Sequence, residues 1–219
     1  MRSSGELTPS LVTAVKGNGK INTHHANQDQ GSFVLYSDGK MILIDPGYFE
    51  DTADKHSLSL IGSNATTLNP RGEAPIMQAS ERGDLRTMTV DATAAYATTD
   101  PKTKQTTALA HRVRRLFVQV GDQALITLDD IQPTNPNDPI TVRWQAGVPV
   151  KIDQNQAAFS HEKGQVFLQT FGPSLTLQAT PRQFSKDWVY KKAGVPWTTV
   201  SGTYQADGKL PLITVITRV

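Results

Sequence analysis

The 219-residue sequence contains no cysteine, so disulfide bonds and thiolate metal sites are excluded. Charge of one sign is also scarce, because 22 Lys and Arg stand against 20 Asp and Glu, which leaves a formal net charge of +2. So small an excess is typical of an ordinary solvated surface and does not indicate a nucleic-acid partner. The sequence has no apolar run long enough to span a bilayer and no signal-peptide pattern near its N-terminus. We therefore expect a soluble domain, either mature or excised, with no membrane partner.

Helical periodicity is nearly missing too, whereas short apolar runs separated by turn residues recur along the chain. Residues 33–36 and 41–44 flank Ser37-Asp38-Gly39-Lys40, which carries the Asp-Gly signal of a tight hairpin turn. The sequence predicts an all-β fold, an antiparallel β-sandwich of stacked sheets, with fewer than about a tenth of its residues helical against a typical third. Further strands are expected at residues 11–16, 58–61, 86–92, 113–120, 124–129, 141–145, 148–152, 157–160, 165–171, 175–179, 198–205 and 212–217.

Three polar or proline-rich stretches are predicted to be loops. Residues 63–83 form the longest, and residues 97–105 form the second. The third, residues 133–139, has three prolines in seven residues and is the strongest breaker. It divides the chain into a β-domain at residues 1–132 and a part at residues 133–219. The sequence leaves open whether this second part continues the sandwich or is a small C-terminal β-domain.

Polar side chains gather around the predicted hairpin, in a set comprising His25, Asn27, Asp29, Asp45 and His56. The first three alternate just before a strand, so an extended backbone points them to one side. Asp45 ends the second strand on the same rim, and this is a place where a sheet presents a metal ligand or a proton-transfer group. No nucleophile elbow, phosphate-binding loop or CxxC cluster supports a hydrolase, nucleotide-binding or redox function.

The same segment carries a resemblance to a known family. It reads His-x-(His or Asn)-x-Asp-x-x-Ser-Phe, a strand, a Gly turn, a strand ending Asp-Pro-Gly-Tyr, and Lys-His before another apolar run. This order of residues resembles the heparinase II/III family of polysaccharide lyases. The resemblance is dense over residues 23–62 and weaker over residues 111–130. The resemblance implies the C-terminal β-sandwich portion of an enzyme that cleaves uronic-acid-containing polysaccharides, heparin- or heparan-like, alginate-like or related, by β-elimination.

Further expectations follow from the resemblance. The partner would be an acidic polysaccharide, and the location periplasmic or extracellular. The family's large helical toroid is absent from this chain and carries its catalytic tyrosine, so the isolated chain is expected to be inactive. His25 resembles the β-domain histidine that lines the cleft at the scissile sugar, where an imidazole with a pKa near ~6.5 takes or shares a proton. The alternative role for His25 is a surface histidine with a local hydrogen bond.

A structural zinc site is also implied, because Asn27, Asp45 and His56 fall where family members commonly place His, Asp and His. Asn27 departs from that pattern, and an amide oxygen is a poor ligand for zinc. We therefore expect weak or absent zinc binding by these residues. The alternative is a metal-free hydrogen-bond cluster that ties the hairpin to the loop before Leu58.

Other residues leave the function open. Three arginines, Arg112, Arg114 and Arg115, either contact an acidic polymer or belong to a solvated surface, and the first and second of them share one strand face. Trp144, Trp188 and Trp197 are either sugar-stacking platforms or core residues. The competing functions are a non-catalytic carbohydrate-binding or structural β-module, and an adhesin-like interaction domain.

Overall fold

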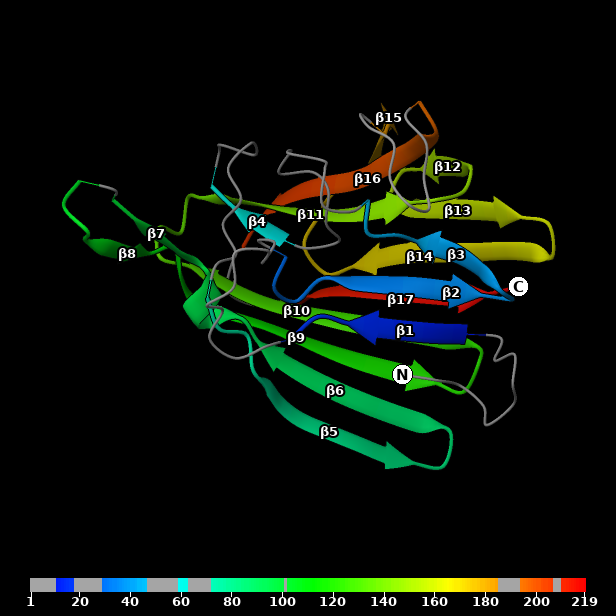
Figure 1. The fold of residues 1–219 in the computed structure, drawn as a ribbon, viewed down its shortest axis with the longest axis horizontal. Helices are drawn as coiled ribbons and strands as arrows, with labels where there is room; N and C mark the ends of the chain where they lie inside the picture. Colours follow the sequence, from blue (N-terminus) through cyan, green and yellow to red (C-terminus); the bar gives the residue numbers. More distant parts are fainter. Residues whose placement is uncertain are drawn as a thin grey trace.

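A computed structural model describes residues 11–17, 29–46, 59–62, 72–100, 102–184, 194–206 and 210–219. Within these residues two antiparallel sheets stack face to face, and the helical content is one 3₁₀ turn, η1 (Thr93–Ala95) (Figure 1). The predicted all-β sandwich is confirmed. Nothing in the described part of the chain forms a helix of the length and hydrophobicity that a bilayer span requires.

The strands of each sheet come from both halves of the chain. Among the described residues, the seven-stranded sheet contains, in spatial order, β1 (Leu11–Val15), β2 (Phe33–Ser37), β3 (Lys40–Leu43), β11 (Pro139–Ala146), β16 (Pro196–Gln205) and β15 (Gln178–Gln183), with β4 (Ser59–Ile61) also paired to β11. The eight-stranded sheet contains β12 (Val150–Asp153), β13 (Gln156–His161), β14 (Gly164–Phe171), β17 (Leu212–Arg218), β10 (Ala124–Pro133), β9 (Ala110–Val120), β6 (Leu85–Asp91) and β5 (Ile76–Arg82). The proline-rich stretch joins β10 of one sheet to β11 of the other, so strands from before and after it lie in both sheets.

The predicted hairpin forms between β2 and β3. Its turn residues Asp38 and Gly39 have φ angles of 51° and 81°, the left-handed region that a primed hairpin turn requires. The Asp38 carboxylate also accepts a hydrogen bond from Arg218 Nε of β17, at 2.7 Å. This ion pair ties the hairpin turn to the opposite sheet.

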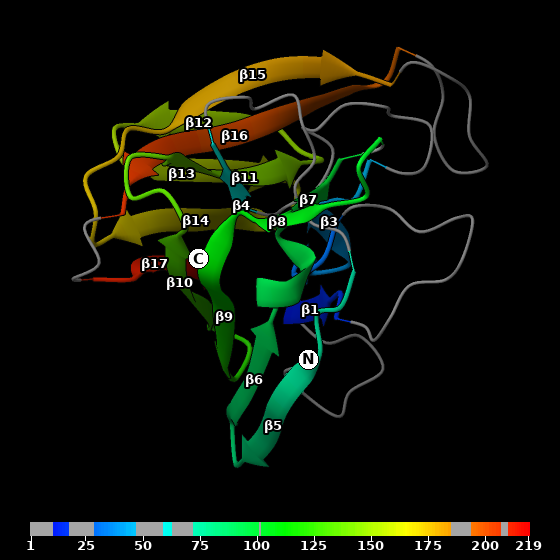
Figure 2. The ribbon, with the colours of Figure 1, turned by 90° about the vertical axis from the view of Figure 1, so that its left-hand side faces the viewer.

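The core fills the space between the two stacked sheets (Figure 2), where β1 and β2 lie against β9. Phe33 of β2 meets Phe117 of β9 edge to face, with ring centroids 5.5 Å apart. Trp144 and Trp197 are 2% and 4% exposed, so both have core positions, while Trp188 lies outside the described residues.

Two of the loop predictions were partly wrong. β5 lies inside the predicted 63–83 loop, and β7 (Ala97–Thr99) pairs with β8 (Thr106–Ala108) across the predicted 97–105 loop to form a hairpin that projects from one end of the sandwich (Figure 1). All seven side chains of β5 are exposed, so the strand has no buried face to produce an apolar alternation. Its pairing with β6 holds it in place, and a local sequence pattern does not report such pairing.

Candidate functional site

Of the four predicted site residues, the structure describes one. Asp45 follows β3 and is half-buried, whereas His25, Asn27 and His56 lie outside the described residues. Within the ranges that the structure describes, no three His, Asp or Glu side chains are grouped closely enough to hold a metal ion. The described residues nearest to the predicted site in sequence are those at which its two segments leave and rejoin the seven-stranded sheet.

The segment that carries His25 and Asn27 ends in a tightly bonded turn before β2. Asp29 is 1% exposed and its carboxylate pairs with Lys16 Nζ at 2.5 Å. The Gly31 N–H donates to the Lys16 carbonyl oxygen at 2.9 Å, and the Lys16 N–H donates to the Ser32 carbonyl oxygen at 2.8 Å. Gly31 has a φ of 79°, which a residue with a Cβ adopts only with strain. These bonds fix the chain where the segment joins the sheet.

The segment that carries Asp45 and His56 leaves and rejoins the sheet along one strand, β11. The Ile44 N–H donates to the Gln145 carbonyl oxygen at 2.8 Å, and Ser59 of β4 is the register partner of Val142. Three residues of an extended strand span about 10 Å, so the two ends of the segment are near neighbours. Asp45 is directly next to the first of these ends.

A single buried guanidinium joins the two anchored segments. Arg115 of β9 forms a fork-shaped ion pair with Asp129 of β10, with Nε–Oδ1 at 2.5 Å and Nη2–Oδ2 at 2.9 Å. Its Nη1 donates to the Gly31 carbonyl oxygen at 2.8 Å, and its Nη2 donates to Ser59 Oγ at 3.3 Å. The Tyr96 hydroxyl donates to the Ser59 carbonyl oxygen at 2.5 Å. We call these five residues the Arg115 cluster.

The electrostatics of the cluster keep Arg115 charged and Tyr96 neutral. Burial lowers the pKa of Arg115, but the adjacent Asp129 carboxylate outweighs burial and leaves that pKa above its ordinary value. Burial raises the pKa of the Tyr96 hydroxyl, so this group remains a hydrogen-bond donor. Arg115 also lies over the ring of Phe33, 5.8 Å from its centroid.

Two predicted site residues outside the described ranges are close in sequence to residues of the cluster. Asn27 is four residues from Gly31, and His56 is three residues from Ser59. The two anchors themselves share the Arg115 guanidinium.

The sequence analysis named Arg115 as a possible polymer contact and did not predict its buried position between the sheets. Arg112 and Arg114 do share the outward face of β9, where they form ion pairs with Asp130 and Asp91. Arg115 is in phase with the buried Val113 and Phe117, so it points between the sheets. The period-two pattern of apolar residues in β9 was the signal that could have found it.

Comparisons with known proteins identify the fold. No family model matches the sequence, and no curated protein matches it either. Among solved structures, the heparan sulfate lyase HepC from Pedobacter heparinus matches 99% of this chain with 34% of its own, at 15% identity and a TM-score of 0.76. A heparinase III structure matches 95% of this chain with 33% of its own, at 15% identity and a TM-score of 0.74. Another heparinase III, the BT4657 gene product, matches 94% of this chain with 32% of its own, at 17% identity and a TM-score of 0.73.

The fold is thus an all-β sandwich of the type found in heparinase III and heparan sulfate lyase structures. The predicted resemblance to the heparinase II/III family is confirmed at the level of the fold. The chain spans about a third of the length of these neighbours.

Proposed function

We propose that this chain is the β-sandwich part of a polysaccharide lyase that cleaves a uronic-acid-containing polysaccharide by β-elimination. The observation that carries the proposal is the match of at least 94% of the chain to heparinase III and heparan sulfate lyase structures. The anchored segments of the candidate site add support, because the motif that resembles the lyase family enters the sheet at the Arg115 cluster. A heparan-like polymer is the first substrate to test, and a periplasmic or extracellular location belongs to the same proposal.

His25 is the residue that we assign to proton transfer. β-Elimination removes the C5 proton of the uronate, and the C4–O bond breaks as the C4–C5 double bond forms. The leaving oxygen then takes a proton. A neutral imidazole near pH 7 is suited to accept the first proton or to share in delivering the second. Neutralisation of the uronate carboxylate is a role for which we assign no residue of this chain.

Zinc fits the proposed ligand set poorly. Asn27, Asp45 and His56 supply one amide oxygen, one carboxylate and one imidazole, whereas zinc sites in proteins are typically built from about four ligands rich in imidazole or thiolate. No step of the proposed reaction is assigned to a metal. We propose instead that these three residues are neighbours that stabilise the loop ends by hydrogen bonds, as the shared Arg115 anchor allows.

The test measures formation of the unsaturated product by its near-ultraviolet absorbance. The isolated chain should form none from heparan sulfate or alginate, because one acid–base group typically contributes only ~10²–10⁴-fold. With a helical toroid domain supplied in trans or by fusion, activity should appear and should fall by at least ~100-fold in His25→Ala. The exposed His111 of β9 offers a matched control, and His111→Ala should keep the activity. Robust turnover by the chain alone, or an unchanged rate in assembled His25→Ala, would contradict the proposal.

A non-catalytic carbohydrate-binding or structural β-module is the second candidate. The observation that favours it is the low identity of the matches, 15% to 17%, which shows a shared sandwich fold and leaves the activity open. Under this alternative the chain binds polysaccharide without a helical partner, and the assembled protein forms no unsaturated product.

A further inference from the structure

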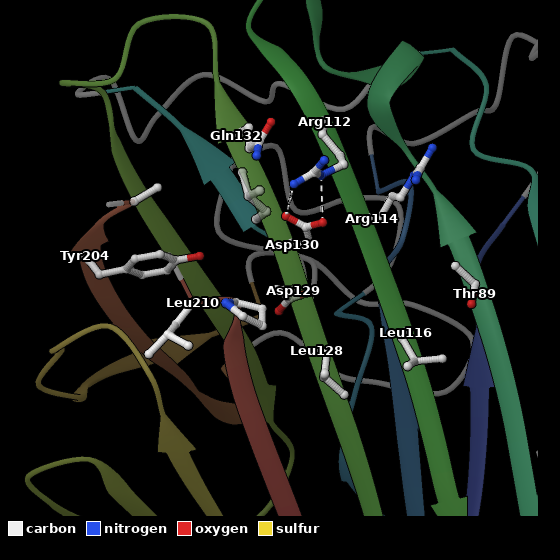
Figure 3. A pocket seen from close by; sticks show the side chains of 13 residues that line it. Thr89, Arg112, Arg114, Leu116, Leu128, Asp129, Asp130, Gln132, Tyr204 and Leu210 are labelled. Atoms are coloured by element: carbon white, nitrogen blue, oxygen red, sulfur yellow. Dashed lines mark hydrogen bonds and ion pairs between the residues drawn. The ribbon is translucent and has the colours of Figure 1, made fainter. Parts of the chain in front are cut away.

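A pocket of about 470 Å³ opens on the outer face of the eight-stranded sheet, at the end of β10 that has no β17 residues beside it. β17 begins at Leu212, opposite Asp129, while β10 continues to Pro133 and keeps only β9 beside it. The open side is bordered by Tyr204 near the end of β16 and by Leu210 (Figure 3). Pro211, next to Leu210 in the connection to β17, also lines the pocket. A volume of this size lies in the range of small-ligand sites, ~300–1,000 Å³.

The charges that line this pocket are already paired. Arg112 contacts Asp130 with Nε–Oδ2 at 2.6 Å and Nη2–Oδ1 at 3.0 Å, and Arg114 Nε contacts Asp91 at 2.8 Å. The third carboxylate at the pocket, Asp129, is held by Arg115. An anionic ligand would compete with these carboxylates for the same guanidinium groups, so the lining favours an uncharged ligand.

The same pairs present donors and acceptors side by side. A guanidinium has five N–H donors and a carboxylate has about four acceptor sites, so the Arg112–Asp130 pair keeps both kinds of group for a ligand. Gln132 adds an amide with donors and an acceptor. Adjacent hydroxyls of a sugar ring, each a donor and an acceptor, match this arrangement.

Tyr204 adds a buried hydroxyl group to the pocket. Its side chain points toward β10 and into the pocket (Figure 3), and it is 5% exposed. Its hydroxyl makes no hydrogen bond with the part of the chain that the structure describes. Burial raises the pKa of this hydroxyl, so it remains protonated and can donate. Leu128, Leu210 and Pro211 complete apolar walls for the C–H face of a pyranose.

We propose that this pocket binds an uncharged pyranose unit of a glycan chain. The pocket opens on the outward face of the sheet, and Asp129 in its lining is paired with Arg115 between the sheets. Binding here holds polysaccharide on the sandwich whether or not cleavage follows.

The experiment titrates the purified chain with cellotetraose, chitotetraose and maltotetraose by calorimetry, and in parallel with a heparin tetrasaccharide. At least one uncharged tetrasaccharide should bind. Gln132→Ala and Tyr204→Phe should each weaken that binding about 3- to 10-fold, the effect of one lost hydrogen bond. Gln169→Ala is the matched control, because Gln169 is a half-buried glutamine of β14 outside the pocket lining. This control should bind as the unchanged protein does.

Three outcomes would overturn the proposal. These are no binding of any uncharged tetrasaccharide, an equal loss in Gln169→Ala, or tighter and strongly salt-dependent binding of the heparin tetrasaccharide that Gln132→Ala abolishes. Thermal melting of each variant separates lost binding from lost folding. The titrations use the chain alone and measure no product formation, so failure of the pocket proposal is distinguishable from failure of the proposed lyase function.

Discussion

The Arg115–Asp129 ion pair provides the sharpest test of how the sandwich holds its candidate site. Both side chains are buried, at 10% and 3% exposure, and the guanidinium also bonds Gly31 and Ser59. Arg115→Met removes the charge and the donors while it keeps an unbranched chain. Asp129 is then left as a buried carboxylate without its fork-shaped partner.

The expected loss in the free energy of unfolding is about 3–5 kcal/mol, the range for removal of one partner from a buried ion pair. Domains of this kind are typically stable by only about 5–15 kcal/mol, so the variant would lie near the limit of folding. Burial decides the size of the effect, because water cannot solvate the carboxylate that remains.

Two further variants isolate this cause. Arg112→Met breaks an ion pair on the same strand, but its partners are 37% and 44% exposed, so the expected loss is about 0–1 kcal/mol. The double variant Arg115→Met, Asp129→Leu removes both buried charges and should recover most of the loss.

Urea denaturation measures all of these variants, with the fluorescence of the buried Trp144 and Trp197 as the signal. The slope of unfolding free energy against urea should stay constant between variants, so that midpoints report stability. A loss below about 1 kcal/mol in Arg115→Met, or a double variant no more stable than the single one, would refute the reasoning.

Two other predictions concern metal binding and pH. Asn27→His should strengthen zinc binding, because imidazole is a better zinc ligand than an amide. Elemental analysis after extensive dialysis measures the bound zinc. Stoichiometric zinc in the unchanged chain would contradict the expected weak binding. Burial raises the pKa of Asp38, but hydrogen bonds from Arg218 and Ser37 outweigh burial and leave that pKa below its ordinary value. A carboxyl group whose pKa is lowered by folding stabilises the folded protein at pH values above its unfolded pKa, near ~3.9. This stabilisation is lost as the pH falls through the pKa of the folded state. The unfolding free energies of the unchanged chain and Asp38→Asn should therefore converge between about pH 4 and pH 2, as urea titrations at each pH would measure, and a constant difference would contradict this assignment.

Local sequence determined the parts of this protein in which a strand has one buried face. The hairpin of β2 and β3 is specified by an Asp-Gly turn between two apolar runs, and its turn has the required positive φ angles. The outward positions of Arg112 and Arg114 follow from the period of two in β9. The sequence also predicted a rim of candidate residues from polar residues at the ends of apolar strands, and of these the structure describes Asp45.

Tertiary structure decided which residues meet across the sheets. Gly31 and Arg115 are 84 positions apart, and they meet because the two sheets stack with β2 opposite β9. The pocket beside Tyr204 exists because β17 begins opposite Asp129 while β10 continues. Both features depend on strand order and on where partner strands begin and end. A local pattern reports which face of a strand is buried, but it carries no information about which distant strand lies opposite.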